Sequence, residues 1–180
     1  MADVGREWLM YGLDNIQNGD YWRILTGHIV HLNLEHSILN LSGLWIIAYM
    51  FERNAKWWSW TLLTVVISLG CSVLFLILNS EPGETGYLQW YVGLSGTLHG
   101  LFFLAAISEW PVDRRLSSVL LLILVAKLIY AQFFGASPGT EAFIKGRVVE
   151  DAHVYGSIQG VILGVLFRKW LFETWKSAPG

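Results

Sequence analysis

Five long apolar segments separated by short polar stretches dominate the hydrophobic pattern of this 180-residue chain. A membrane-spanning helix needs about 20 predominantly apolar residues. The pattern therefore predicts an all-α membrane protein with five visible spans. Turn chemistry at Glu81-Pro82-Gly83-Glu84 and Ser137-Pro138-Gly139 separates some of them. The predicted spans cover residues 34–51, 57–78, 93–110, 116–134 and 152–172.

The first 33 residues are too polar to span a membrane, since charges recur through residues 1–20. They also lack the apolar run of a signal peptide. Residues 7–14 and 21–32 favour short helices lying at the membrane interface. No repeat or linker divides the chain, so we expect one domain over residues 1–180. In it, residues 1–33 form an interfacial segment and first loop, and residues 34–172 hold the membrane helices.

Composition agrees with a membrane protein and excludes other classes. Hydrophobic residues make up 54% of the chain and charged residues 14%, whereas a soluble domain carries about 25% charge. The ten Trp and seven Tyr residues suit a protein with two membrane–water interfaces. The net charge of −2 gives no reason to expect a nucleic-acid partner, and the single cysteine, Cys71, excludes an internal disulfide.

Lys and Arg residues divide unequally between the two sides that five spans define. One side holds seven basic residues and four of the 14 carboxylates. The other side holds four basic residues and ten carboxylates. Because positive loops stay in the cytoplasm, the first side is expected to be cytoplasmic. Its basic residues are Arg53, Lys56, Arg114, Arg115, Arg168, Lys169 and Lys176.

A serine turn opens the third segment, where the chain reads Gly93-Leu94-Ser95-Gly96-Thr97-Leu98-His99-Gly100. A serine among glycines at a helix N-terminus can act as a nucleophile, because the backbone can bend and free amides point toward it. Counting back from the charged inner boundary places Ser95 about 5–10 Å below the outer surface. Irregular backbone at that depth needs a hydrated cavity or a protein shell.

Histidines and glycines suggest partners for this serine. The segments that start at residues 34, 93 and 152 run from outside to inside, and each has polar residues at its outer end. Two of them also carry glycines every four residues, which lets helix backbones approach closely. Such packing would bring Ser95 to His153, a nucleophile with a general base. The polar residues are His36, Asn40, Ser95, His99 and His153, and the glycines are Gly96, Gly100, Gly156, Gly160 and Gly164.

Motifs along nearly the whole chain resemble those of the rhomboid family of intramembrane serine proteases. Tyr21-Trp22-Arg23 resembles the Trp-Arg motif of the first rhomboid loop, and His36-Ser37-Ile38-Leu39-Asn40 resembles the family's His-x-x-x-Asn. Glu52-Arg53 follows at the inner end of that helix. Gly93-Leu94-Ser95-Gly96 resembles Gly-x-Ser-Gly, and Ala152-His153-Val154-Tyr155-Gly156 with Gly160 resembles Ala-His-x-x-Gly-x-x-x-Gly.

Within the family, the chain is most similar to the rhombosortase branch, on His99-Gly100, Ala126-Lys127 and the segment around His153. The resemblance implies Ser95 as nucleophile and His153 as base. It also implies an oxyanion site of His36, Asn40 and amides near Ser95. The implied substrates are membrane-anchored proteins with a C-terminal Gly-Gly sorting segment. They would be cut at the outer, periplasmic face of a bacterial inner membrane.

Several points remain open in the sequence. A rhomboid core of this type has six helices, and the first is not visible before Trp22. Lys127 is interpreted either as a pairing or substrate-binding residue near the site, or as a residue that snorkels or hydrogen-bonds a neighbouring carbonyl. His99 and Gly93 are possible accessory residues. No carboxylate is expected to orient His153, because Glu150 and Asp151 are expected to point elsewhere. His28 and His31 are expected in an interfacial loop.

Two other functions remain as alternatives. The chain could be a catalytically inactive rhomboid-like scaffold that binds membrane segments. It could also be a haem or metal protein that uses His36, His99 and His153. The protease interpretation requires no cofactor or metal.

Overall fold

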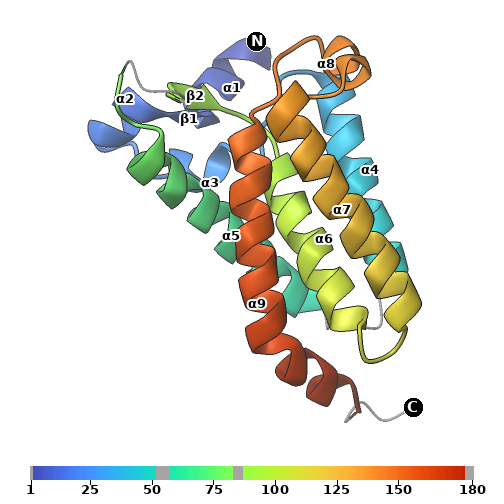
Figure 1. Ribbon diagram of the computed structural model, residues 1–180. Helices are drawn as coiled ribbons and strands as arrows, with labels where there is room; N and C mark the ends of the chain where they lie inside the picture. The colour runs from blue at the N-terminus through green and yellow to red at the C-terminus, as the bar shows by residue number, and fades with distance from the viewer. Residues whose placement is uncertain (1, 52–56, 83–86, 177–180) are drawn as a thin grey trace.

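The computed structural model describes residues 2–51, 57–82 and 87–176. In these residues a bundle of long helices carries the fold (Figure 1), and every predicted span is confirmed as a helix. Four of the five differ from the predicted spans by a few residues at one or both ends. The helices at the predicted spans are α4 (Leu34–Met50), α5 (Trp57–Leu78), α6 (Ser95–Glu109), α7 (Arg114–Phe134) and α9 (Glu150–Lys176).

Helix α6 lies at the centre of the bundle and contacts α4, α5, α7 and α9. It is therefore buried on nearly every side, from Gly96 through Ala106. Figure 1 shows that α6 and α9 both begin at the end of the bundle where the N-terminal segment lies. This topology brings Ser95, the first residue of α6, to the same end as the first turn of α9.

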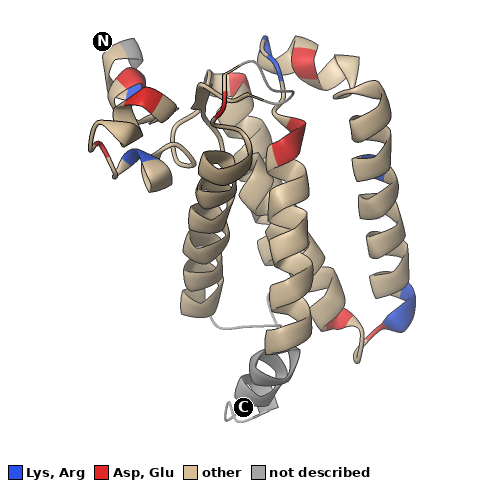
Figure 2. Ribbon diagram, turned by 60° about the vertical axis from the view of Figure 1, so that its left-hand side comes forward, with Lys and Arg blue, Asp and Glu red and all other residues tan. Residues whose placement is uncertain are grey.

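The surface of the bundle suits a lipid environment. Figure 2 shows charged residues gathered at the two ends, with a single basic position halfway along α7. Large apolar side chains are exposed along the helices, among them Trp45, Leu62 and Leu122. Exposure of this extent marks a membrane or interaction surface.

By length and hydropathy alone, two of the described helices qualify as spans: α5, with a mean hydropathy of 2.6, and α7, with 2.0. Helices α4 and α6 contain only 17 and 15 residues, and α9 carries polar residues in its first turns. The sequence prediction treated all five segments alike. Helices α4 and α6 differ from the other spans by their shorter length, and α9 differs by the charged residues Glu150 and Asp151 in its first turn.

Side-chain caps set the starts of two helices. The Asn33 side chain accepts a hydrogen bond from the His36 amide at 2.9 Å and begins α4. The Asp113 carboxylate accepts from the amides of Arg115 and Leu116 and begins α7. Such caps satisfy amides that have no partner within the helix.

The turn predicted at residues 137–139 is instead the start of a short helix, α8 (Pro138–Ile144). Pro138 occupies its first turn, where a missing amide proton costs nothing and the fixed φ suits a helix. A proline followed by a glycine is a common turn signal, so the sequence predicted a turn where a helix begins.

The N-terminal segment is also more divided than predicted. Residues 7–14 and 21–32 do not form two helices, because α1 (Ala2–Leu9), β1 (Tyr11–Gly12), α2 (Leu13–Gln17) and α3 (Arg23–Thr26) follow one another there. Strand β1 pairs antiparallel with β2 (Trp90–Tyr91), just before the serine turn. The segment is thereby attached to the chain that leads into Ser95.

Arg23 holds this segment together from inside. Its side chain is 6% exposed. It donates hydrogen bonds to the carbonyls of Glu7 at 2.7 Å and Met10 at 3.0 Å, and to the Asp20 carboxylate at 3.0 Å. The Trp-Arg motif of the first loop therefore has a structural role in the described residues.

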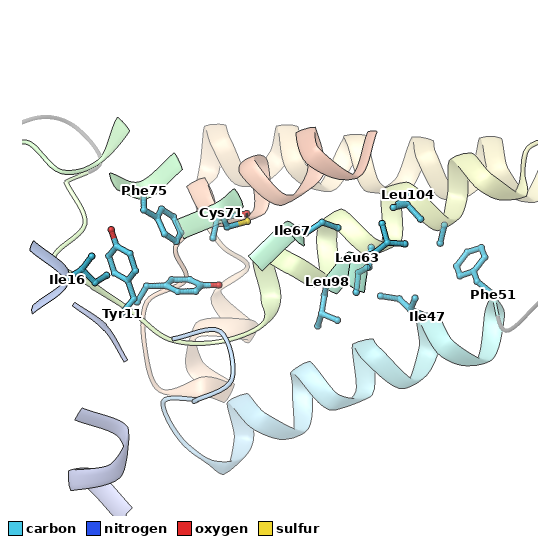
Figure 3. Close-up of a cluster of buried hydrophobic side chains, with 14 of the residues drawn as sticks. Tyr11, Ile16, Ile47, Phe51, Leu63, Ile67, Cys71, Phe75, Leu98 and Leu104 are labelled. Atoms are coloured by element: carbon cyan, nitrogen blue, oxygen red, sulfur yellow. Dashed lines mark hydrogen bonds between the residues drawn. The ribbon is translucent and has the colours of Figure 1, made fainter. Parts of the chain in front are cut away.

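The hydrophobic core continues from this segment into the bundle (Figure 3). At one end Tyr11 and Ile16 pack near Phe75. At the other end side chains of α4, α5 and α6 interlock, including Ile47 and Leu63. Because the core is continuous, the N-terminal segment and the helices form one packed unit.

His28 lies in a turn after α3, as predicted for a loop residue, but it is buried at 1% exposed and does not face an interface. The Ser72 hydroxyl donates to the Ile24 carbonyl at 2.6 Å, so it accepts from His28 Nε2 at 2.9 Å. His28 Nδ1 has no hydrogen-bond partner among the described residues. Protonation there would bury an unpaired charge, and burial lowers the pKa of His28 to about 4.

We expect acid to destabilise the fold through His28. Its pKa in the unfolded chain is about 6.5, so the unfolded state binds more protons at lower pH. The penalty is absent above about pH 6.5 and grows to roughly 3 kcal/mol by about pH 4. Thermal unfolding in detergent across this range should show a falling midpoint. The fall should be smaller for His28→Gln, which keeps a donor for Ser72, and equal falls in both proteins would contradict the assignment.

Candidate active site

Ser95 and His153 meet at the end of the bundle where α6 and α9 begin. The Ser95 hydroxyl lies 3.1 Å from His153 Nε2, although 58 residues separate the two in the chain. Ser95 is half-buried at the N-terminus of α6, where helix amides have no intrahelical acceptor. The pairing that the glycine pattern predicted is therefore present in the structure.

Close packing of α6 against α9 produces this contact. A β-carbon built at Gly96 would lie 2.7 Å from the Ala152 carbonyl oxygen. One at Gly156 would collide with the Gly96 carbonyl, and one at Gly160 with the Gly100 carbonyl. The helices therefore approach backbone to backbone, as small residues at spacing four allow.

Glu150 corrects one sequence expectation. Its carboxylate Oε2 lies 2.9 Å from His153 Nδ1, so a carboxylate does contact the histidine that bonds Ser95. The sequence prediction had Glu150 pointing elsewhere on the helix, and this was wrong. Residues three apart share one helix face, and Glu150 is the first residue of α9. Asp151 does point away, toward the Asn79 amide at 3.1 Å.

His99 lies directly against His153. The two rings stack with centroids 4.0 Å apart and planes 18° apart. His99 Nδ1 donates to the Ser95 carbonyl at 2.8 Å, because a carbonyl only accepts. On the other side, the Lys127 ammonium donates to His99 Nε2 at 2.6 Å. The structure thus favours the partner interpretation of Lys127 over snorkelling, and it brings His99 into the site.

Gly93 makes room for His36 beside the serine turn. Its φ of +114° suits glycine because other residues meet steric strain there. A β-carbon at Gly93 would lie 2.6 Å from His36 Cε1 and 2.8 Å from His36 Nε2. The Gly93 amide donates to the Gly27 carbonyl at 3.0 Å, which fixes the turn. A side chain at this position would displace the imidazole.

Asn40 lies one helical turn after His36, and both side chains are buried. The Asn40 amide nitrogen donates to the His36 carbonyl at 3.0 Å, a bond within α4. Around His36 the ring of His31 approaches with a centroid distance of 5.1 Å. At this end of the bundle, the side chains of His36, His99 and His153 therefore lie around the turn that holds Ser95.

The comparison with known families decides the class of this protein. A model of the rhomboid domain matches residues 18–170. The chain belongs to the rhomboid family. It is also similar to the rhomboid protease GlpG of Haemophilus influenzae, with 28% identity over 145 residues that cover 74% of this chain and 68% of that protein. Family and relative together support an intramembrane serine protease.

In this rhomboid protein, three of the motifs meet at one site, although they come from separate helices. The His-x-x-x-Asn motif lies on α4, Gly-x-Ser-Gly opens α6, and the motif around His153 lies on α9. The Trp-Arg motif instead braces the N-terminal segment through Arg23. Glu52 and Arg53 lie outside the described residues.

The geometry argues against the alternative of a metal or haem site. His99 and His153 have all four ring nitrogens in hydrogen bonds, to Ser95, Lys127 and Glu150. Parallel stacked rings also cannot both direct a nitrogen at one ion between them. The described residues contain no group of three or more His, Cys, Asp or Glu residues arranged to hold a metal ion.

Sequence reasoning missed two features of this site. The spacing of Glu150 and His153, three residues apart at a helix start, was a usable signal. The β1–β2 pairing spans two residues in each strand, too few for any alternation pattern to reveal.

Proposed function

We propose that this rhomboid protein is an intramembrane serine endopeptidase with Ser95 as nucleophile and His153 as general base. The observation that carries the proposal is the hydrogen bond of 3.1 Å between the Ser95 hydroxyl and His153 Nε2. A hydroxyl in reach of an imidazole is the minimal activated nucleophile. Its position at the start of a buried helix adds free amides beside the reacting atom.

The reaction follows from these two groups. Ser95 Oγ attacks the carbonyl carbon of the scissile bond while His153 Nε2 takes the hydroxyl proton. The tetrahedral intermediate collapses as His153 returns that proton to the leaving amine, which leaves an acyl group on Ser95. A water molecule, deprotonated by His153, then hydrolyses the ester and restores both residues. The cycle is balanced without a cofactor or metal.

The oxyanion of the intermediate would lie at the N-terminus of α6. We assign its stabilisation to the Ser95 backbone amide and to His36 and Asn40. His36 supports this role because its ring lies against Gly93, two residues before the nucleophile. Donors aimed at a developing oxyanion are typically worth about 10²–10³ in turnover each.

The proposed substrate is a membrane-anchored protein with a Gly-Gly pair beside a C-terminal membrane helix, as the rhombosortase resemblance implies. A helical peptide bond is protected by its own hydrogen bonds, so the protease needs a segment that unwinds easily. Each glycine destabilises a helix interior by roughly 1 kcal/mol relative to alanine. Glycine also adds no side chain where Gly93 and His36 already crowd the turn.

We further propose that cleavage occurs at the outer face of a bacterial inner membrane. Basic residues Arg114 and Arg115 begin α7 at the end of the bundle opposite the site. Positive loops remain in the cytoplasm. The site would then open to the periplasm, where it would mature secreted proteins.

Co-expression with a reporter tests both parts of the proposal. The reporter ends in Gly-Gly, a membrane helix and a basic tail, and a matched reporter carries Leu-Leu at the same position. We expect processing of the Gly-Gly reporter and little processing of the Leu-Leu reporter. Equal processing of both would leave the protease assignment and remove the Gly-Gly preference. If neither reporter nor any fluorophosphonate probe reacts with the protein, the inactive scaffold becomes the better assignment.

A further inference from the structure

We propose that Glu150 is a positioning residue for His153, so that the site works as a serine–histidine–glutamate relay and not as a two-residue dyad. The inference rests on the proposed serine protease function. The geometry that supports it is a continuous chain of contacts. Glu150 Oε2 lies 2.9 Å from His153 Nδ1, and His153 Nε2 lies 3.1 Å from Ser95 Oγ.

The Glu150 carboxylate determines which tautomer His153 adopts. An ionised carboxylate only accepts hydrogen bonds, so Nδ1 must carry the proton and donate it to Glu150. Nε2 then presents its lone pair to the Ser95 hydroxyl, which is the arrangement a general base requires. Without Glu150, the ring could equally place its proton on Nε2, and that tautomer cannot accept a proton from Ser95.

Its position and its contact with His153 favour an ionised Glu150. It is the first residue of α9, where the helix dipole stabilises a negative charge. Its side chain is 17% exposed and that of His153 is 7% exposed. Water therefore competes little with their hydrogen bond, and the carboxylate can stabilise the imidazolium that forms when Ser95 attacks.

Other charged and titratable groups also face His153. His99 stacks on it from α6, Lys127 contacts His99 from α7, and His36 on α4 is close enough to interact with it electrostatically. Because the two nitrogens of His99 are held by a carbonyl and an ammonium, His99 stays neutral. Glu150 is thus the anion in contact with His153 among the described residues.

The experiment compares rates of fluorophosphonate labelling in detergent, a reaction that reads activation of Ser95 without a peptide substrate. Glu150→Gln keeps the shape of the side chain but loses its charge. We expect its second-order labelling rate at neutral pH to fall about 10²-fold or more. The acidic limb of the rate–pH profile should move to lower pH, because the charged form of His153 loses its stabilising anion. The unfolding temperature should stay near that of the wild type.

Asp151→Asn is the matched control, since it removes a carboxylate from the same helix terminus without touching His153. It should leave both rate and profile unchanged. Glu150→Asp keeps the charge but shortens the reach. We expect an intermediate rate and an acidic limb closer to that of the wild type, and this variant also serves if Glu150→Gln does not fold.

The outcomes separate the inference from the proposed function. A wild-type rate and profile in Glu150→Gln would overturn the inference. The inference would also fail if both Glu150 variants lost labelling rate in proportion to lost thermal stability while their rate–pH profiles stayed unshifted. That result would indicate a structural role only. In either case an unlabelled Ser95→Ala keeps the protease assignment. Full labelling of Ser95→Ala would instead overturn the proposed function itself.

Discussion

Ser95→Ala is expected to abolish proteolysis and fluorophosphonate labelling while leaving the protein folded. The change removes one oxygen, whose hydrogen-bond partner is His153. The buried contacts of α6 begin with Gly96 and are unaffected. Loss of the nucleophile in a serine protease lowers turnover by about 10⁶-fold, so cleavage should fall below detection. The measurement is in-gel labelling together with reporter cleavage.

Ser137→Ala is the control for this variant. Ser137 is exposed and precedes α8, and its loss should leave labelling and cleavage at wild-type levels. An unfolding temperature close to that of the wild type should accompany the inactive Ser95→Ala protein. Undiminished cleavage by Ser95→Ala would exclude the proposed nucleophile.

Gly156→Val is expected to destabilise the bundle and inactivate the site together. A β-carbon at Gly156 would collide with the Gly96 carbonyl. A backbone carbonyl within a helix cannot rotate away from the clash as a flexible side chain can. Helix α9 must then move away from α6, which separates His153 from Ser95. Overpacking of this kind typically costs about 1–3 kcal/mol. A shift of even about 1 Å at a catalytic contact can lower the rate roughly 10²-fold.

Gly164→Ala provides a graded control on the same face of α9. Its β-carbon would lie 3.2 Å from Ile107 Cβ and from Leu104 Cα, a tight but tolerable approach far from Ser95. We expect a small change in unfolding temperature and nearly full labelling. If Gly156→Val unfolded and labelled like the wild type, the close approach of α6 and α9 would not be what assembles the site.

The hydrophobic pattern predicted the helices of the bundle well because apolar runs report directly on burial in protein or lipid. The end of α5 at Leu78 matches the end of the apolar run. Where the only signal was a proline or glycine that can mark either a turn or a helix boundary, the prediction was less accurate. Pro138 indicated a turn but begins α8, because proline suits both a turn and the first turn of a helix.

The candidate site was predictable to the extent that local spacing reveals it. The serine turn and the glycine repeats indicated that Ser95 would meet His153, and the structure has that contact at 3.1 Å. The partners of Lys127 and His28 were not predictable. Both depend on which residue of another helix lies opposite, His99 in one case and Ser72 in the other.

The sequence by itself determined the membrane class of this protein, the helices of its bundle and the order of its motifs. Each of these depends on residue type averaged over a helix or on short spacings along one. Only the tertiary structure decided that His99 stacks on His153 and that the N-terminal segment pairs with the chain before Ser95. Hydrogen bonds and ring contacts depend on rotamers and helix separation to within a few tenths of an ångström. A linear pattern of hydrophobic and polar residues carries no information at that scale.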